Sequence, residues 1–298
     1  MPFGLVTGLA AALCWGSMDI ASALASRRIG SLWVVAAVQL IGVTILVAVA
    51  ILTDTAIPTD PVALALSALL GLIGAGAYFS YFTGLRIGPI AVVSGMVAAY
   101  GGLTVVLSVV LRGETLTLLQ ALGAAVATIG VILTGIAFDG GWRSTRFAGP
   151  GVIFAIAALV LFAMMAITTD VAIEHAEWLQ VLLVSRLVNA VLGVVVLGIV
   201  VWHAARRRTS GLHAPPGALP GGRILALVLV AGVLDILGLA VFAFGLANAP
   251  TWMVGLASSF GPAVTILFAV AFLGERLKPI QWFGLCGVVV GMVAIAIP

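Results

Sequence analysis

The sequence predicts an all-α integral membrane protein with ten transmembrane helices, arranged as two inverted five-helix repeats. Three observations support this fold class. The composition is 63% hydrophobic and 8% charged, whereas a soluble domain carries about 25% charged residues. Apolar stretches of about 20 residues, the length that crosses a bilayer, follow one another along the chain. The second part of the chain also repeats a segment of the first part.

The apolar stretches are separated by short loops that leave no room for a soluble domain. The expected helices lie at residues 4–24, 32–52, 62–84, 89–110, 118–138, 150–172, 178–202, 222–246, 251–272 and 280–297. The first stretch lacks a basic flank and a clear small-residue cleavage site. We therefore expect it to be a helix rather than a signal peptide.

Residues 84–135 and 245–296 are two copies of one segment. Identical residues recur 161 positions apart, in the pairs Gly84 and Gly245, Pro89 and Pro250, Gly113 and Gly274, Glu114 and Glu275, Gln120 and Gln281, Gly123 and Gly284, and Gly130 and Gly291. The first repeat is expected at 1–138 and the second at 150–298. Five helices is an odd number, so the second repeat must enter the membrane upside down. Such a duplication is typical of bundles that handle a solute near the bilayer midplane.

The basic residues are distributed unevenly over the loops. Of the 13 lysines and arginines, 11 fall in odd-numbered loops between the expected helices. Arg112 lies in an even-numbered loop, and Arg186 lies within the helix at 178–202. Because cytoplasmic loops are enriched in lysine and arginine, we expect the odd-numbered loops in the cytoplasm and both termini outside.

Three ionisable residues, Asp19, Arg186 and Asp235, lie well inside expected helices. Charged groups within a bilayer are costly and usually face the bundle interior or a cavity. Arg186 and Asp235 lie at similar depths, so we expect them to form an ion pair; binding of a substrate carboxylate by Arg186 is the alternative. Two roles remain open for Asp19. It binds a proton or the amine of a substrate, or its carboxylate is hydrogen-bonded near the end of its helix.

Aromatic, hydroxyl and sulfur-containing side chains within the expected helices are further candidates for a solute cavity. Trp15, Tyr78 and Tyr100 each carry a polar group that needs a partner or water inside the membrane. Satisfaction by a neighbouring backbone carbonyl is the alternative. The complete set of expected cavity residues is Trp15, Met18, Asp19, Tyr78, Ser94, Tyr100, Met164, Thr168, Arg186, Asp235, Ser258 and Ser259.

Other residues are expected to act on the shape of the bundle. Pro262 removes a backbone hydrogen bond and should bend the helix at 251–272, which favours that helix as a cavity wall. Glu114 and Glu275, which are matched in the repeat, are expected to be structural or gating residues. Glycine pairs are expected at close helix contacts, with a dimer face as the alternative; they are Gly71 with Gly74 and Gly287 with Gly291.

No motif for covalent chemistry is convincing. The chain has no phosphate-binding glycine loop followed by lysine, no clustered His and Cys ligands, and no Ser-His-Asp set. We therefore expect neither an enzyme nor an ATP-driven pump, and no cofactor, metal or nucleic-acid partner. The expected partners are a small-molecule solute and the lipid bilayer, with the protein as a monomer or homodimer.

Two segments of the repeat resemble a known signature. Phe-Gly-Pro at 260–262, followed by Phe-Leu-Gly-Glu-Arg-Leu at 272–277, is similar to the EamA signature of the drug/metabolite transporter superfamily. A degenerate twin has Tyr-Gly-Gly at 100–102 and Leu-Arg-Gly-Glu-Thr-Leu at 111–116. Trp15 and its neighbouring glycine also match the family's habit. Because Gly101 stands where Pro262 stands in the second copy, the helix at 89–110 is expected to bend less than the helix at 251–272.

The resemblance implies a multi-pass protein of the bacterial inner membrane that works by alternating access. Its central cavity would be lined mainly by the first, third, fourth, sixth, eighth and ninth helices, with the fifth and tenth as peripheral scaffold. The chain most resembles YddG-like exporters, which implies a secondary transporter exporting small neutral or aromatic amino acids and related metabolites. A multiply phosphorylated substrate would need several convergent lysines or arginines, so sugar phosphates are disfavoured.

Two other functions remain open at this stage. Efflux of cationic hydrophobic compounds would depend on Asp19 and the aromatic residues. A membrane scaffold or receptor without transport would leave the charged residues inside the membrane with little purpose. The resemblance also implies cytoplasmic termini, in conflict with the distribution of basic residues.

Overall fold

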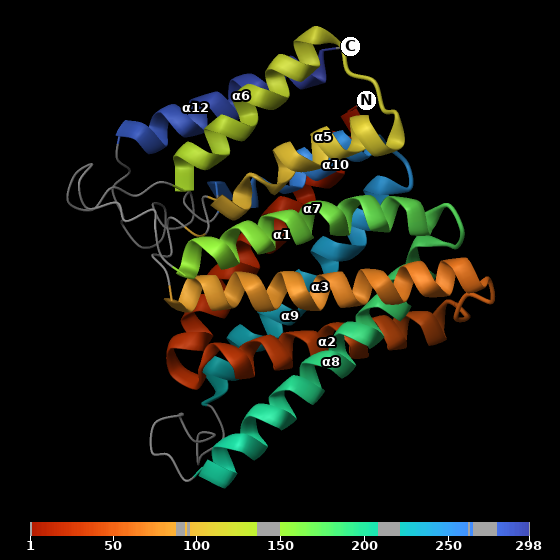
Figure 1. Ribbon diagram of the computed structural model, residues 1–298, viewed down its shortest axis with the longest axis vertical. Coiled ribbons are helices and arrows are strands. Elements are labelled where there is room, and N and C mark those ends of the chain that lie inside the picture. The colour runs from red at the N-terminus through yellow and green to blue at the C-terminus, as the bar shows by residue number, and fades with distance from the viewer. Residues whose placement is uncertain are drawn as a thin grey trace.

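The computed structural model describes most of the chain and places nearly all of the described residues in helices. The described residues are 2–87, 93, 96–135, 150–207, 221–261, 263–264 and 279–297. Within these ranges there are ten helices and no strand (Figure 1). They are α1 (Pro2–Ile29), α2 (Ser31–Leu52), α3 (Pro61–Ile87), α5 (Tyr100–Arg112), α6 (Leu118–Gly135), α7 (Pro150–Ile173), α8 (Trp178–Arg207), α9 (Gly222–Leu246), α10 (Thr251–Ser258) and α12 (Pro279–Ala296).

Hydropathy explains why these segments form a bundle with an apolar outer surface. Six of the described helices are long and apolar enough to cross a membrane, and three shorter apolar helices accompany them. The outer faces carry large exposed hydrophobic side chains, such as Ile51, Val110 and Phe283. Alanine and glycine are frequent at the buried contacts between helices. Small residues inside and large apolar residues outside are the pattern of helices that pack in lipid.

The two halves of the chain interlock through equivalent pairs of helices. α1 packs on α9 in the same way that α3 packs on α7, and α2 and α8 pack on each other. α6 also packs on its equivalent, α12, and α5 packs on α10; these last two are different parts of the equivalent expected helices at 89–110 and 251–272. α6 and α12 lie side by side at one edge of the bundle (Figure 1). The repeat in the sequence is therefore also a repeat in the packing.

Four of the described turns between helices fall at one end of the bundle, whereas the turn at Gly30 between α1 and α2 lies at the other end. The turns after α2, α5, α7 and α9 lie at the right in Figure 1, as do the start of α1 and the end of α12. α1 runs away from this end, whereas α7, the first helix of the second half, runs towards it. The first helices of the two halves therefore run in opposite directions.

The expected helices at 89–110 and 251–272 are both interrupted, and at equivalent positions. Ala99 forms a turn in which its N–H bonds to Met96 O at 3.1 Å, and Phe260 N bonds to Ala257 O at 3.4 Å. Both bonds reach back three residues, which tightens the helix locally. The first copy is therefore interrupted although it has no proline here. The smaller bend expected for the helix at 89–110 stays a prediction, because Pro262 lies outside the described residues.

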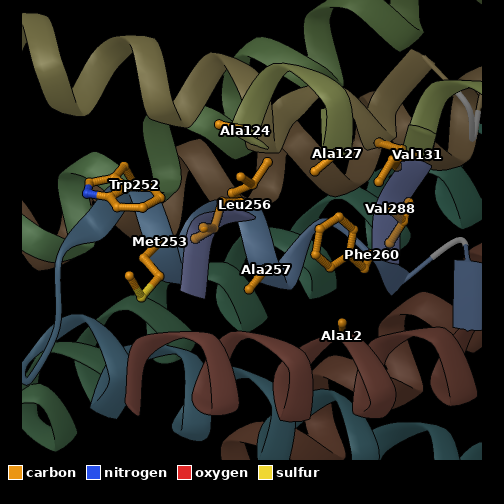
Figure 2. Close-up of a cluster of buried hydrophobic side chains, with 12 residues drawn as sticks. Ala12, Ala124, Ala127, Val131, Trp252, Met253, Leu256, Ala257, Phe260 and Val288 are labelled. Carbon is orange, nitrogen blue, oxygen red and sulfur yellow. The ribbon is translucent and has the colours of Figure 1, made fainter. Parts of the chain in front are cut away.

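α10 lies at the centre of the bundle. Every residue from Thr251 to Gly261 is buried. Figure 2 shows Leu256 and Phe260 between Val131 of α6 on one side and Ala12 of α1 on the other, within a larger apolar cluster. Burial on all sides places the second-half helix that carries Ser258 next to helices of the first half.

Candidate functional site

The helices line a cavity near the middle of the bundle. Its volume is about 90 Å³, which is room for a small solute or several waters. The lining side chains come from α1, α3, α5, α7, α9 and α10, together with helical residues 97–98 before α5. These are the helices that the resemblance implied. Six aromatic residues dominate the wall: Trp15, Tyr78, Tyr81, Tyr100, Phe162 and Phe242.

The aromatic rings hold one another in fixed orientations. The Phe162 ring is 5.6 Å from the Tyr78 ring at an interplanar angle of 89°, and 5.8 Å from the Tyr100 ring. Trp15 lies 5.5 Å from Phe242 on the other side. Edge-to-face and tilted contacts at these distances are favourable. The wall is therefore a preformed apolar surface that presents ring faces and edges.

Asp19 is the charged residue of the described cavity lining. Its side chain makes no hydrogen bond or ion pair with any described residue. A carboxylate at this depth needs compensation from water, a proton or a bound cation. Asp19 therefore gives the cavity a site that can accept a proton or a positively charged group.

Arg186 and Asp235 form the ion pair that their depth in the sequence predicted. Arg186 Nη2 lies 2.6 Å from Asp235 Oδ2, and the two side chains are 2% and 1% exposed. Arg186 also donates to Gln39 Oε1, and Gln39 Nε2 donates to Asn189 Oδ1 at 3.2 Å. The positive charge of Arg186 is thus neutralised within the protein, and Arg186 does not line the cavity.

Tyr78 connects this buried pair to the cavity. Its hydroxyl donates to Asp235 Oδ1 at 3.1 Å, and its ring lines the cavity. A second, small cavity of about 10 Å³ lies between Met18, Gln39, Tyr78 and Asp235. That volume is close to the space of one water. The polar network between α2, α3, α8 and α9 therefore ends at the cavity wall.

Tyr100 and Ser258 form a second polar contact at the wall. The two hydroxyl oxygens are 3.0 Å apart, and Ser258 Oγ also donates to Gly255 O at 2.9 Å. Tyr100 belongs to the first half of the chain and Ser258 to the second. The contact therefore joins the two halves through α5 and α10.

Several expected cavity residues lie elsewhere. Met164 is 44% exposed on the outer face of α7, and Met165 lines the cavity in its place. One residue turns the side chain by about 100° around a helix axis, which explains the exchange. Thr168 is outside the described lining. Ser259 is buried, donates to Leu256 O at 2.7 Å and also does not line the cavity.

Three expected residues, Ser94, Pro262 and Glu275, lie outside the described residues. Glu114, the counterpart of Glu275, is described. Its two carboxylate oxygens accept the backbone N–H groups of Thr251 at 2.7 Å and Trp252 at 3.0 Å. Glu114 therefore caps the N-terminus of α10, where negative charge is favourable.

The end of the bundle that holds this cap is also closed by ion pairs. Arg112 Nε lies 2.7 Å from Asp170 Oδ2, and Arg112 pairs with Glu174 as well. Arg112 ends α5, whereas Asp170 and Glu174 lie at the end of α7. These pairs join the two halves at the end of the bundle that holds the turns after α2, α5, α7 and α9.

Sequence reasoning missed Tyr81, Phe162 and Phe242 as cavity residues. A signal for Phe162 was present, because an offset of 147 pairs Trp15 with Phe162 and Met18 with Met165. All four residues line the cavity. Outside the two copies at 84–135 and 245–296, the sequence therefore already contained two equivalent pairs of wall residues.

The apolar outer surface, the packing of two repeated halves and the enclosed cavity define a multi-pass membrane protein. The family model of the EamA-like transporter family matches residues 2–136 and again residues 149–297. The chain belongs to the EamA-like transporter family, and it is a membrane transporter with two repeats.

The fold is also found among solved structures. A crystal structure of a protein with 19% sequence identity covers 98% of this chain and 96% of its own, with a TM-score of 0.79. At this identity the likeness concerns the fold. No curated protein sequence matches the chain.

Proposed function

We propose that the protein is a secondary transporter that works by alternating access and exports small neutral or aromatic amino acids and related metabolites. The observation that carries this proposal is the wall of six aromatic residues with the carboxylate of Asp19 among them. An aromatic or apolar solute body fits the rings, and an amino group fits Asp19. The chain's location would be the inner membrane of a bacterium.

The arrangement of the halves supports alternating access. α1 and α7 run in opposite directions (Figure 1), and the packing pairs are symmetric under exchange of the halves. These features fit ten crossings in two inverted five-helix repeats. In such repeats the two halves can exchange conformations, which opens a central site first to one side and then to the other.

The charges near the cavity favour an amino group as the recognised head. A cation over an aromatic face gains about 0.5–2 kcal/mol, with the larger values at desolvated sites, and Asp19 adds an opposite charge. Arg186 is already neutralised by Asp235, so a substrate carboxylate would have to compete with that pair. Anionic solutes such as sugar phosphates are accordingly disfavoured.

The same observation favours one second candidate, the efflux of cationic hydrophobic compounds. Such a compound has an apolar body and a positive charge, and it lacks the carboxylate of an amino acid. Arg186 pairs with Asp235 and does not line the described cavity. The absence of Arg186 from the lining supports a solute without a carboxylate. The two candidates differ in whether the solute's carboxylate matters for transport.

Counterflow in proteoliposomes tests both. The vesicles are loaded with one member of a panel of amino acids, sugar phosphates, nucleosides and a cationic dye. Exchange of Phe, Met or Thr supports amino-acid transport, and exchange of the dye alone supports the second candidate. Exchange of sugar phosphates alone would overturn the proposal.

The Asp19→Asn variant tests the role of the carboxylate. We expect it to reduce exchange at least tenfold, because a charged hydrogen bond to the solute is lost. Glu177→Gln is the matched control, since the Glu177 side chain makes no ion pair with a described residue. Equal exchange by the wild type and Asp19→Asn would remove Asp19 from the site.

A further inference from the structure

The hydrogen-bond polarity of the cavity wall can be assigned from the partners of its hydroxyl groups. We infer that Asp235 and Ser258 are positioning residues that take the hydroxyl protons of Tyr78 and Tyr100, so that neither phenol can donate a hydrogen bond to a solute in the cavity. This inference rests on the proposed function, because it explains how the wall selects the head group of the solute.

The proton of Tyr78 is assigned by the ion pair behind it. Asp235 faces Arg186 at 2.6 Å, and an ionised carboxylate can only accept hydrogen bonds. Tyr78 must therefore donate in its 3.1 Å contact with Asp235 Oδ1. A phenol has one proton, so the Tyr78 oxygen has only lone pairs left for any other contact.

The proton of Tyr100 is assigned by a chain of two hydrogen bonds. Ser258 Oγ lies 2.9 Å from Gly255 O, and a carbonyl oxygen can only accept. Ser258 spends its one proton there, so it must accept in the 3.0 Å contact with Tyr100. Tyr100 is then the donor, and its oxygen too can offer only lone pairs to a solute.

These assignments make the polar part of the wall an acceptor surface. Asp19, Tyr78 and Tyr100 all line the cavity, and with these assignments the side-chain oxygens of all three can only accept hydrogen bonds from a solute. The Trp15 Nε1 donor has no exposed surface, and it faces α9, where a Cβ on Gly238 would lie 2.8 Å from it. A primary ammonium group carries three N–H donors and no acceptor, which is the complement of this wall. A neutral alcohol or a carboxylate fits it less well.

The protonation pattern can be tested without any solute. In the Raman spectrum of tyrosine, the intensity ratio of the Fermi doublet reports whether the phenol oxygen donates or accepts a hydrogen bond. The chain has 3 tyrosines, so difference spectra against Tyr78→Phe and Tyr100→Phe isolate each residue. We expect a donor signature for both. An acceptor-only signature for Tyr100 in the wild type would overturn the assignment.

Selectivity is tested by binding of two probes to the full chain in lipid nanodiscs, benzylammonium and benzyl alcohol. We expect Ser258→Ala to lower the benzylammonium-to-alcohol affinity ratio about tenfold, because Tyr100 then turns its proton towards the cavity. Tyr100→Phe should lower the ratio similarly by removing the acceptor. In the Tyr100→Phe background, Ser258→Ala should have no further effect, since it acts through Tyr100.

Ser259→Ala is the matched control, because Ser259 is a buried neighbour that donates to its own helix and does not line the cavity. It should leave the ratio unchanged. If the wild type binds benzylammonium and Ser258→Ala leaves the ratio unchanged, the inference fails and the proposed function stands. If the wild type binds no benzylammonium, the amine-recognising function fails, and the Raman result still decides the proton assignment.

Discussion

Arg186 is a charged residue whose environment was only partly visible in the sequence. Its depth predicted the pair with Asp235, and that pair is confirmed at 2.6 Å. The contacts to Gln39 and Tyr78 bring in α2 and α3, so that four helices share one polar network. Among the described residues the buried Nε of Arg186 has no hydrogen-bond partner, so the network is not fully paired, and in a low-dielectric interior an unpaired polar group is costly.

At this scale we predict that Arg186→Met destabilises the protein by about 3–5 kcal/mol, because it leaves the Asp235 carboxylate buried without its partner. The measurement is reversible unfolding in mixed micelles. Arg186→Met combined with Asp235→Leu should recover part of the loss, since no charge then remains. Additive losses in that double variant would contradict a coupled pair.

Arg112→Met provides the comparison. Arg112 is 24% exposed, and pairs that reach solvent contribute about 0–1 kcal/mol. We therefore expect a much smaller loss than for Arg186→Met in the same unfolding assay. A loss as large as that of Arg186→Met would mean that the end of α5 depends on its ion pairs for folding.

At the scale of elements, the contact between α6 and α12 depends on glycine. A Cβ at Gly130 would lie 2.6 Å from Val288 N and 2.7 Å from Gly284 O, and one at Gly291 would lie 2.6 Å from Ala127 N. Backbone atoms cannot move aside as a flexible side chain does. These glycines let two helices of the two halves approach closely, and Gly291 was among the glycines expected at such a contact.

We predict that Gly130→Ala destabilises the bundle by about 1–3 kcal/mol, because the added methyl group must push the two backbones apart. Gly193→Ala is the control in α8, where nothing lies within 4 Å of the added Cβ. That change should be neutral or stabilise by up to about 1 kcal/mol through helix propensity. Thermal unfolding in detergent distinguishes the two, and equal effects would contradict the close contact.

The capping of α10 by Glu114 leads to a further prediction at the element scale. Glu114→Gln removes the charge and one acceptor, so we expect the start of α10 to lose roughly 1 kcal/mol of local stability. Hydrogen exchange should then become faster at the backbone amides of Thr251 and Trp252, which donate hydrogen bonds to the Glu114 carboxylate. Unchanged protection of these amides would mean that the cap does not hold the helix end.

For the whole molecule, the open question is its orientation in the membrane. The start of α1 and the end of α12 lie at the same end of the bundle as the turns after α2, α5, α7 and α9 (Figure 1). Of the 13 basic residues, 11 lie in the odd-numbered loops between the ten expected helices. Because basic loops remain in the cytoplasm, we predict that both termini face outside. Fusions to alkaline phosphatase at the C-terminus should be active, and fluorescence of a C-terminal green fluorescent protein instead would reverse the orientation.

Helix formation and the presence of two repeats could be predicted because they depend on local hydropathy and on a repeat along the chain. In lipid each helix must satisfy its own backbone hydrogen bonds, so a stretch of apolar residues is enough to indicate one. The identities of Trp15, Asp19, Tyr78 and Tyr100 as cavity residues followed from their polar groups within such stretches.

The rotation of each helix about its axis was not available from local patterns. It is set by packing against neighbours distant in sequence, and lipid-facing and buried surfaces of these helices are similarly apolar. This is why Met165 rather than Met164 lines the cavity, and why Phe162 and Phe242 were missed. Hydropathy thus specifies which segments cross the bilayer, and only tertiary packing decides which side chains meet at the centre.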